Sequence, residues 1–404
     1  MKFVLTSLSI AVFVASSLLS PAELRSDASI LSVERVVKGN NQFALDLYLK
    51  VSRARDGNLF LSPYSLSLAL AMIYAGARGE TAKQVASVAS FPLNQTHLHP
   101  VFGSLNQNLK KSVNFQEQLI IANALWKQSG ISSKPFVSII QNHYGSALMD
   151  ADFAKDPEDS RQTINAWIEQ QTKEKIKEIL PNGSVDFSTK LLLTNAVYFK
   201  AQWAKRFQAR DTRTAYFSVT KKESTKVAFM RSIEKFRYYD DGIVQALELP
   251  YSGGAFSMMV LLPHKVDGLL DSARWFTQDR LSDIDRSVSQ KVIVILPKFN
   301  LKDGLELRNT LCEMGMPVAF SRDADFSGID GLHDLFLSSV IQKSHLTVDE
   351  EGTEAAVATG AIGSQISSED LPVFRADHPF IFIIRDNRSA SILFVGRITN
   401  PSLS

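Results

Sequence analysis

Apolar residues recur along the first half of the chain with the spacing of helices. In residues 40–52, 62–77 and 159–180 apolar side chains return every three or four positions, with polar residues between them. The second stretch, "SPYSLSLALAMIYAGA", also begins with a helix start signal, with Ser62 as N-cap and Pro63 at the first helical position. The pattern predicts helices over these three ranges.

The second half of the chain contains apolar runs that are typical of strands. Several runs are apolar at consecutive positions, which is expected for central strands of large sheets whose two faces are both covered. The closing runs, "PFIFIIRD" and "SASILFVGRIT", predict a β-hairpin with Asn387 at its turn. Helical patterns followed by strand patterns favour an α+β single domain. The strand-like runs span residues 190–203, 243–251, 256–263, 291–301, 379–386 and 389–399.

The net charge and the single cysteine narrow the classes of protein. With 44 basic and 42 acidic residues among 404, the net charge is +2, which argues against a nucleic-acid partner because such proteins carry a basic surplus. Cys312 is the only cysteine, so the chain can form neither an internal disulfide nor a cysteine zinc site. Because Cys312 lies on a helical pattern, we expect it to be a buried small hydrophobic residue.

The first 22 residues have the composition of a secretory signal peptide. Lys2 precedes a short apolar stretch, residues 3–14, and small residues follow it. We therefore expect a signal peptide over residues 1–22, a mature chain of residues 23–404, and secretion to the extracellular space; an N-terminal anchor is the alternative. No other apolar run is long enough to span a membrane, so no membrane association is expected. In a secreted chain three sequons would be glycosylation sites: Asn94, Asn182 and Asn387.

The sequence lacks the motifs of common enzyme classes. It contains no G-x-S-x-G elbow, no H-E-x-x-H zinc motif and no complete phosphate-binding loop. The run "GARGET", residues 76–81, resembles such a loop but follows a predicted helix and lacks the lysine. Only His97 and His99 have metal-ligand spacing. We expect no enzyme activity, metal or cofactor, with a Ser-His-Asp triad assembled in space as the alternative.

Residues 350–370, "EEGTEAAVATGAIGSQISSED", contain too few large apolar side chains to form part of a core. Read with the period of a strand, alternate small residues from Thr353 to Thr359 fall on one face, which could enter a sheet without a clash. Glycines at 352, 360 and 363 allow unusual backbone conformations at both ends. The segment can therefore be an exposed loop or a strand inside a sheet. The alternative is a solvated linker without a structural role, which composition alone would favour.

Many motifs of the chain resemble those of the serpin family, in the family's order and spacing. The run "VDEEGTEAAVATG" is similar to the hinge of inhibitory serpins, where Glu-Glu-Gly-Thr precedes small residues. "NLFLSPYSLSLALAMIYAGARGET" resembles the family's second helix, "INAWIEQQTKEKI" its helix over the main sheet, and "LTNAVYFKAQW" the strand that follows. "LELPYSGGAFSMMVLLP", "LPKFNL", "ADFSGI" and the closing hairpin complete the series. The resemblance implies one serpin domain of three β-sheets and eight to nine helices, with an exposed reactive-centre loop at about residues 350–374.

The resemblance also implies how such a protein acts. In serpins a target serine protease attacks the loop and forms an acyl-enzyme, and the cleaved loop inserts into the central sheet, a known example of strand addition and of release of stored strain. This implies a monomeric inhibitor that forms a covalent complex with its protease. The family's spacing places the scissile bond at Ile366–Ser367. The corresponding hinge residues are Glu350, Glu351, Gly352 and Thr353, and the inserting face consists of Ala355, Val357 and Thr359.

A second set of residues matches the family's positions beneath the central sheet, where the strands must part. Ser62, Ser65 and Asn195 match its polar cluster. Gln342 occupies the position of a family histidine, and because glutamine does not titrate, we expect no pH-sensitive opening there. Trp203 matches the tryptophan at which the loop first enters the sheet.

The composition of the loop favours one class of protease over another. From Ser344 to Phe374 the chain contains no Lys or Arg, whereas trypsin-like enzymes need a basic residue to pair with the acid in their specificity pocket. Ile366 suits an elastase-like pocket first and a chymotrypsin-like pocket second. The alternatives are a non-inhibitory serpin that acts as a carrier or binding protein, and a cross-class inhibitor of cysteine proteases.

Two groups of basic residues raise the question of a heparin-like glycosaminoglycan cofactor, which some serpins use. Neither group forms a dense basic run, so a solvated charged surface is the favoured interpretation. The groups are Lys110 and Lys111, and Lys200, Lys205, Arg206 and Arg210.

Overall fold

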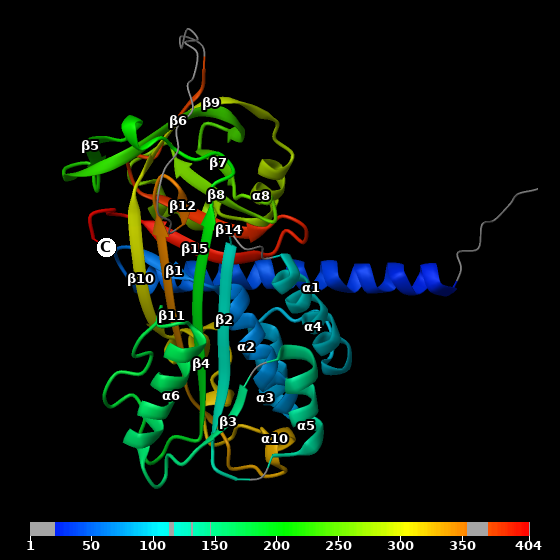
Figure 1. The fold of residues 1–404 in the computed structure, drawn as a ribbon. Helices are drawn as coiled ribbons and strands as arrows, with labels where there is room; N and C mark the ends of the chain where they lie inside the picture. Colours follow the sequence, from blue (N-terminus) through cyan, green and yellow to red (C-terminus); the bar gives the residue numbers. More distant parts are fainter. Residues whose placement is uncertain (1–20, 113–116, 131, 146, 354–370, 404) are drawn as a thin grey trace, which may run out of the picture.

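The computed structural model describes residues 21–112, 117–130, 132–145, 147–353 and 371–403, which form ten α-helices and fifteen strands (Figure 1). The helices are α1 Pro21–Ala54, α2 Pro63–Gly76, α3 Gly79–Val88, α4 Gln95–Ser112, α5 Lys134–Ile139, α6 Pro157–Gln171, α7 Ser272–Trp275, α8 Gln278–Asp285, α9 Arg308–Met314 and α10 Ser327–Asp330. The strands are β1 Leu59–Leu61, β2 Glu117–Gln128, β3 Ala147–Ala151, β4 Leu191–Gln202, β5 Arg213–Ser218, β6 Ser224–Asp240, β7 Val244–Pro250, β8 Phe256–Pro263, β9 Ser289–Pro297, β10 Phe299–Glu306, β11 Leu337–Val348, β12 Gly352–Thr353, β13 Val373–Arg375, β14 Phe380–Asp386 and β15 Ile392–Ile398. The predicted α+β class is confirmed.

A six-stranded sheet carries the segments that matter for function. Its strand order is β10-β11-β4-β2-β3, and the short strand β12 pairs with β4 beside this path. The pairs β11·β4 and β2·β3 are parallel, whereas β10·β11, β2·β4 and β12·β4 are antiparallel. Figure 1 shows α6 on one face of this sheet and α2 on the other. The sheet therefore lies inside the molecule, as its apolar strands predicted.

The remaining strands form one hydrogen-bonded sheet of nine strands. Their order is β1-β15-β14-β8-β7-β6-β9-β13, with β5 attached to β6. The long strand β6 pairs with β9 through Phe229–Arg237 and with β7 through Arg237–Asp240. Strand β6 thus joins the strands on the β7 side of this sheet to those on the β9 side. The second and third sheets implied by the resemblance are therefore continuous with each other in this structure. The closing hairpin is formed as predicted, since β14 and β15 pair antiparallel across residues 387–391.

Strand β4 separates two hydrophobic cores. Leu191, Leu193 and Val197 point into the large core between the two sheets, and Leu192 and Ala196 point into a smaller core under α6. This is the period of two that a strand with both faces buried requires.

The helix predicted over residues 159–180 ends early, at Gln171. Lys173 and Glu174 have positive φ angles of 51° and 62°, which break the helix, and the Thr172 hydroxyl accepts a hydrogen bond from the backbone of Ile176. Ile176 is nevertheless buried, in the smaller core. The apolar residues after Gln171 are spaced as in a helix but reach the core from a turn, so the prediction of a helix was wrong beyond residue 171.

Two other expectations concern single features. Cys312 is half-buried against the large core rather than fully buried, and its burial raises the pKa of the thiol. Within the described ranges, no helix has the length and hydropathy that crossing a membrane requires.

Candidate functional site at the hinge of the central sheet

One edge of strand β4 is shared by two partners that run in opposite directions. From Leu191 to Tyr198, this edge pairs in parallel with β11, which ends the ladder at His345. Beyond it, Gly352 and Thr353 form β12 and pair antiparallel with Gln202 and Ala201. The other edge of β4 is occupied throughout by β2. A strand that continued from β12 would therefore run along the β4 edge that β11 now holds.

Gly352 fits at this position because it has no side chain. Its φ is +151°, and a Cβ atom there would lie 2.2 Å from the Ala201 oxygen and 2.5 Å from the Gln202 Cα. Both contacts are with backbone, which cannot move aside as a flexible side chain could. The backbone approach of the hinge to β4 therefore requires glycine.

Trp203 holds the turn that precedes Gly352. Its backbone N–H donates to the Glu351 oxygen at 2.9 Å, and its indole Nε1 donates to the Asp349 oxygen at 2.9 Å. The ring is stacked on Tyr251, with 4.6 Å between centroids and 7° between planes. The tryptophan predicted at the place where the loop enters the sheet thus contacts the hinge turn directly.

The carboxylate of Glu350 anchors the same turn from the other side. It accepts a hydrogen bond from the Thr212 hydroxyl at 2.8 Å and pairs with Lys298 Nζ at 2.7 Å. Burial acts to raise the pKa of Glu350, but the bonds from Lys298 and Thr212 outweigh it and hold the pKa below its ordinary value. Burial dominates at Asp349, whose pKa is raised. Glu350 is therefore the charged anchor of the hinge.

The predicted polar cluster beneath the sheet is assembled around strand β4. The Asn195 side chain lies between α2 and β11: its Nδ2 donates to the Ser65 hydroxyl at 2.6 Å, and its Oδ1 accepts from Gln342 Nε2 at 2.7 Å. Gln342 also joins α2, because its Oε1 accepts from the Ser62 backbone N–H at 2.9 Å and its Nε2 donates to the Ser62 oxygen at 3.0 Å. The four predicted residues form one buried network that spans the β4·β11 junction.

Asn123 on β2 is a fifth member that sequence reasoning missed. Its Oδ1 accepts from Asn195 Nδ2 at 2.6 Å and from the Ser65 hydroxyl at 3.0 Å, and its Nδ2 donates to the Ser65 oxygen at 3.0 Å. The signal was a lone asparagine in the otherwise apolar run "LIIANALW". A buried amide in a central strand needs partners, so it marks a polar cluster.

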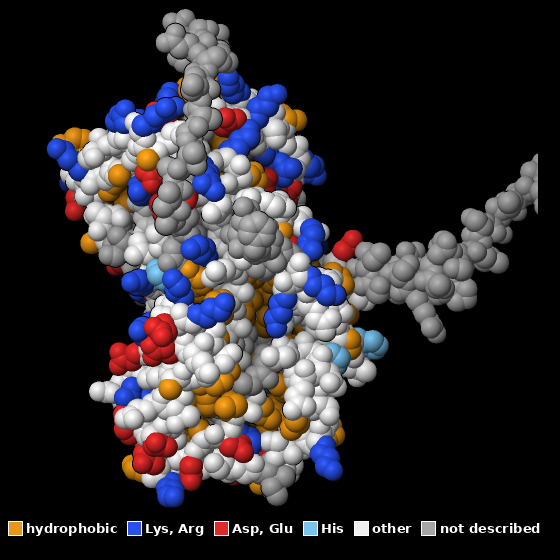
Figure 2. Space-filling model, in the orientation of Figure 1, with side chains coloured by type: hydrophobic (Ala, Val, Ile, Leu, Met, Phe, Trp, Pro, Cys, Tyr) orange, Lys and Arg blue, Asp and Glu red, His pale blue; other side chains and the backbone are white. Residues whose placement is uncertain are grey.

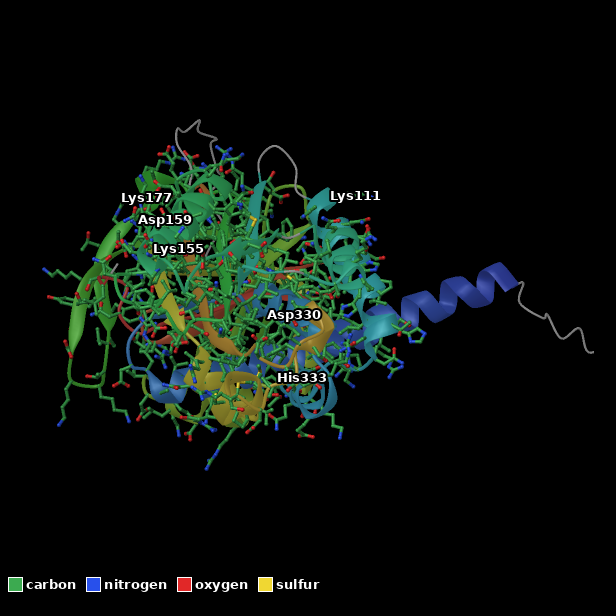
Figure 3. The ribbon with its side chains drawn as sticks, turned by 90° about the horizontal axis from the view of Figure 1, so that it is seen from below. Lys111, Lys155, Asp159, Lys177, Asp330 and His333 are labelled. Carbon is green, nitrogen blue, oxygen red and sulfur yellow. The ribbon has the colours of Figure 1, made fainter. Side chains whose placement is uncertain are left out.

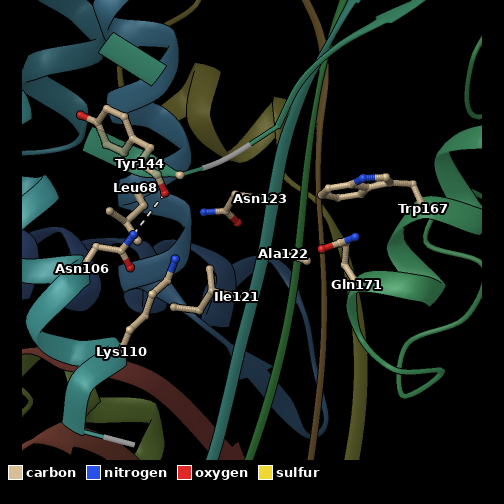
Figure 4. Close-up of a pocket in the computed structure, with 10 residues that line it drawn as sticks. Leu68, Asn106, Lys110, Ile121, Ala122, Asn123, Tyr144, Trp167 and Gln171 are labelled. Atoms are coloured by element: carbon tan, nitrogen blue, oxygen red, sulfur yellow. Dashed lines mark hydrogen bonds between the residues drawn. The ribbon is translucent and has the colours of Figure 1, made fainter. Parts of the chain in front are cut away.

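Asn123 also lines a small cavity of about 70 Å³ beside the sheet (Figure 4). In the close-up Asn106 and Lys110 come from α4 on one side, and Trp167 and Gln171 come from α6 on the other. The dashed line marks the bond from Asn106 Nδ2 to the Tyr144 oxygen, 3.3 Å long. The strand that borders the cavity is β2, at Ile121, Ala122 and Asn123, which pairs with β4 on its other edge.

Several predicted site residues lie outside the described residues. They are Ala355, Val357 and Thr359 of the inserting face and Ile366 and Ser367 of the expected scissile bond. The three sequon asparagines, Asn94, Asn182 and Asn387, are described and exposed.

Basic side chains around the hinge are partly paired with acids. On the face shown in Figure 2, Lys and Arg side chains gather over the upper half of the molecule, and acids lie mainly at the lower left. Lys205 pairs with Glu234 at 2.8 Å, and Arg206 donates to Gln202 at 2.7 Å and lies 4.0 Å from Glu351. These contacts agree with the favoured interpretation of a solvated charged surface, and nothing in the structure tests the alternative of a glycosaminoglycan cofactor.

Comparison with known proteins decides the family. A family model described as serpin (serine protease inhibitor) matches residues 38–401. This chain belongs to the serpin family. The serpins are protease inhibitors rather than enzymes, and they act on serine proteases.

Individual relatives agree with the family over almost the whole chain. Bovine leukocyte elastase inhibitor is 40% identical over 91% of this chain and 100% of its own length. Human serpin B3 is 36% identical over 90% of this chain and 99% of its own length. The structure of human thyroxine-binding globulin superposes with a TM-score of 0.84 at 27% identity, over 92% of this chain and 99% of that chain. The serpin fold predicted from the motifs is confirmed.

The prediction of secretion is wrong. The leukocyte elastase inhibitors and serpin B3, which this serpin matches over their full length or nearly so, are intracellular serpins that lack signal peptides. A single lysine followed by a short apolar run meets the compositional rule for a signal peptide without specifying export. The predicted glycosylation of Asn94, Asn182 and Asn387 depended on secretion and loses its support with it.

Proposed function

We propose that this serpin inhibits an elastase-like serine protease as a suicide substrate whose cleaved loop inserts between β11 and β4. The observation that carries the proposal is β12. The chain reverses after β11, and two residues of the hinge already pair antiparallel with Gln202 and Ala201. Because β12 runs antiparallel to β4, each further residue of the loop could pair with the next residue of β4 in the direction from Ala201 towards Leu191.

Insertion requires β11 and β4 to separate and then to pair with the new strand. Separation breaks the parallel ladder from Leu191 to Tyr198 and the bond between Gln342 and Asn195. A strand placed between them would be antiparallel to both and would form hydrogen bonds on both edges. Antiparallel pairing is slightly more stable per residue than the parallel pairing that it replaces. Uncleaved, the loop is tethered at both ends, so a barrier holds the native state.

The chemistry of trapping follows from the order of two events. The serine Oγ of the protease attacks the carbonyl carbon of the residue before the scissile bond, which we place at Ile366–Ser367, and the amine of Ser367 leaves with a proton from the protease histidine. The ester that joins Ile366 to the protease moves with the inserting strand before water hydrolyses it. Small residues at Ala355, Val357 and Thr359 suit the inward face of such a strand.

Two features support an elastase-like target. Ile366 is a medium-sized apolar residue, and no Lys or Arg occurs from Ser344 to Phe374. The relatives that match nearly all of this chain include proteins named leukocyte elastase inhibitor, at up to 40% identity.

The test is incubation with pancreatic elastase, chymotrypsin and trypsin, followed by denaturing electrophoresis and mass spectrometry of the released peptide. We expect a denaturation-resistant complex with elastase and a peptide that begins at Ser367. Thr353→Arg places a long cation on the inserting face and should convert the inhibitor into a cleaved substrate. Glu354→Arg, one position along and on the opposite face of the strand pattern, should keep the complex. A complex with trypsin and none with elastase would contradict the proposed target.

A non-inhibitory binding role is the second candidate, because thyroxine-binding globulin, whose structure is described as a complex with its small ligand, shares the fold over 92% of this chain. The melting temperature before and after loop cleavage separates the two. An inserting inhibitor should gain many degrees on cleavage, whereas a carrier whose loop stays outside the sheet should gain almost none.

A further inference from the structure

A second site lies far from the hinge, in a pocket of about 790 Å³ beside the C-terminal end of α1, a size typical of small-ligand sites. Its walls are the last turns of α1, the turn between β5 and β6, the segment around α7, and the chain on either side of the β14–β15 hairpin. Asn58, in the segment that follows α1, donates a hydrogen bond from its Nδ2 to the Asn400 oxygen at 2.7 Å and so joins this segment to the C-terminal one. Figure 1 shows the chain terminus beside the end of α1. We call this site the α1-end pocket.

The wall of the α1-end pocket contains a buried cation without a counter-ion. Arg397 is 9% exposed, and its guanidinium donates to the backbone oxygens of Ser52, Arg55 and Gly57 at 3.1, 2.6 and 2.9 Å. No carboxylate pairs with it among the described residues. Three carbonyls orient the guanidinium but leave its charge uncompensated, and two of its five N–H donors have no acceptor in the part of the chain that the structure describes. An anion in the pocket would supply the negative charge and the hydrogen-bond acceptors that Arg397 lacks.

The rim adds further positive charge. Arg53 and Lys222 are exposed, and among the described residues the guanidinium of Arg53 and the ammonium group of Lys222 form no hydrogen bond or ion pair. Lys221 is paired with Asp267 at 2.6 Å. Counting all lining residues, four cations (Arg53, Lys221, Lys222 and Arg397) face two acids (Asp56 and Asp267), which leaves a net charge of +2.

The rest of the lining is apolar. Leu49, Val266 and Leu269 are half-buried in the wall, and Pro379 is buried beside them. Leu270, on the edge of the pocket, is 88% exposed and extends the apolar surface of the wall to the pocket mouth. A ligand with an apolar body would cover this surface.

We propose that the α1-end pocket binds an amphipathic anion with a carboxylate head and an aliphatic body, such as a free fatty acid. The carboxylate lies against Arg397 and the rim cations, where a bidentate contact with a guanidinium is favourable. The aliphatic body lies along Leu49, Val266 and Leu269. This site is independent of the hinge and of protease inhibition.

The binding test uses dodecanoate below its micelle-forming concentration, titrated into the full-length protein by calorimetry. Arg53→Glu/Lys222→Glu should weaken binding about tenfold or more, because both partner-free rim cations are reversed. The matched control is Lys111→Glu/Lys155→Glu, which reverses two partner-free surface lysines elsewhere, both labelled in Figure 3. The control should bind like the unmodified protein. An equal loss in both double variants would mean nonspecific charge attraction and would overturn the site.

Three further measurements keep the proposal falsifiable. Ala273→Phe occupies part of the pocket and should abolish binding, whereas Ala154→Phe, at an exposed alanine outside it, should not. Dodecanol, which has the same body and no charge, should bind much more weakly than dodecanoate. Vesicles of anionic phospholipid distinguish a membrane headgroup from a free acid: binding to vesicles without binding to monomeric dodecanoate would overturn the proposal. Circular dichroism melting confirms that each variant is folded.

Discussion

Gln342 and Asn195 face each other across the parallel strands β11 and β4, and the amide of Gln342 donates to that of Asn195 at 2.7 Å. This contact joins the two strands that must separate if the loop is to insert. Because Asn195 also binds Ser65 and Asn123, the junction is tied to α2 and to β2 at the same point. In the proposed mechanism, loop insertion has to break the Gln342–Asn195 bond of this cluster, so the cluster would contribute to the barrier to insertion.

Removal of the Ser65 hydroxyl should loosen the junction. Ser65→Ala removes the hydrogen bond that the hydroxyl donates to Asn123 Oδ1 and the one that it accepts from Asn195 Nδ2, and the loss of these two buried bonds should lower native-state stability by about 1–3 kcal/mol. The measurement is urea unfolding of the uncleaved protein. Ser67→Ala, on the same helix, is the matched control, because the buried Ser67 hydroxyl has no partner among the described residues. Equal losses in the two variants would mean that the cluster does not contribute specifically.

Substitution of the hinge glycine should expel β12 from the sheet. Gly352→Ala adds a Cβ at 2.2 Å from the Ala201 oxygen, and φ is +151°, so a cost of at least about 1–3 kcal/mol is expected. Hydrogen exchange of the Thr353 amide and limited proteolysis of the hinge should both become faster. Gly183→Ala, at φ +78° and with no atom within 4 Å of the added carbon, isolates the conformational cost from the clash. If both variants left the hinge equally protected, the close approach would not matter.

The ion pair between Glu350 and Lys298 should make docking of the hinge dependent on pH. A carboxyl group whose pKa is lowered in the folded state contributes stability above its unfolded pKa, near 4.5, and loses it as pH falls through the lower folded value. Hinge exchange should therefore accelerate below about pH 4.5, and Glu350→Gln should remove this dependence. A double-mutant cycle with Lys298→Met should show a coupling of about 1 kcal/mol at pH 7. No measurable coupling would mean that solvent screens the pair.

His345 supplies a titratable group close to the position where Gln342 replaces the family histidine. It lies three residues further along β11, opposite Tyr198, and its Nε2 lies 3.1 Å from Asn300 Oδ1. Burial lowers its pKa to about 4, and the charges of Lys302 and Lys175 act in the same direction. Because the unfolded chain takes up the proton first, the stability of the native state should fall as pH decreases from about 6.5 to about 4.

His345→Gln tests this prediction, because it should flatten the melting temperature between these pH values and stabilise the acidic protein. Thr347 and Asn300 also face His345, and neither titrates in this range. His99, whose pKa is also lowered to about 4 by burial and by His143, is the control. His99→Gln should remove part of the acid sensitivity but leave hinge exchange unchanged. An unchanged pH profile in His345→Gln would contradict the role of this residue.

The order of motifs along the sequence was sufficient to predict the family and the class of fold. Residues 350–370 combine a hinge glycine, small residues at alternate positions and several acids. This composition suits a segment that is soluble when exposed and that could also fit into a sheet without a clash. Ser62, Ser65, Asn195 and Gln342 were placed together because a family pattern places them together, and the structure brings them within hydrogen-bond distance. Apolar strands such as residues 190–203 predicted burial on both faces, which β4 has.

Tertiary structure decided the features that depend on distant partners. The helix after Gln171 could not be predicted to end, because the same apolar spacing packs Ile176 into a core from a turn as well as from a helix. Asn123 entered the cluster only because β2 lies beside β4. The anchoring of Glu350 by Lys298 joins residues 52 positions apart in the chain (350 − 298). The α1-end pocket is built from five separate segments. Local pattern determines which faces are apolar and which residues are small, whereas contacts between remote segments exist only after the sheets have closed around them.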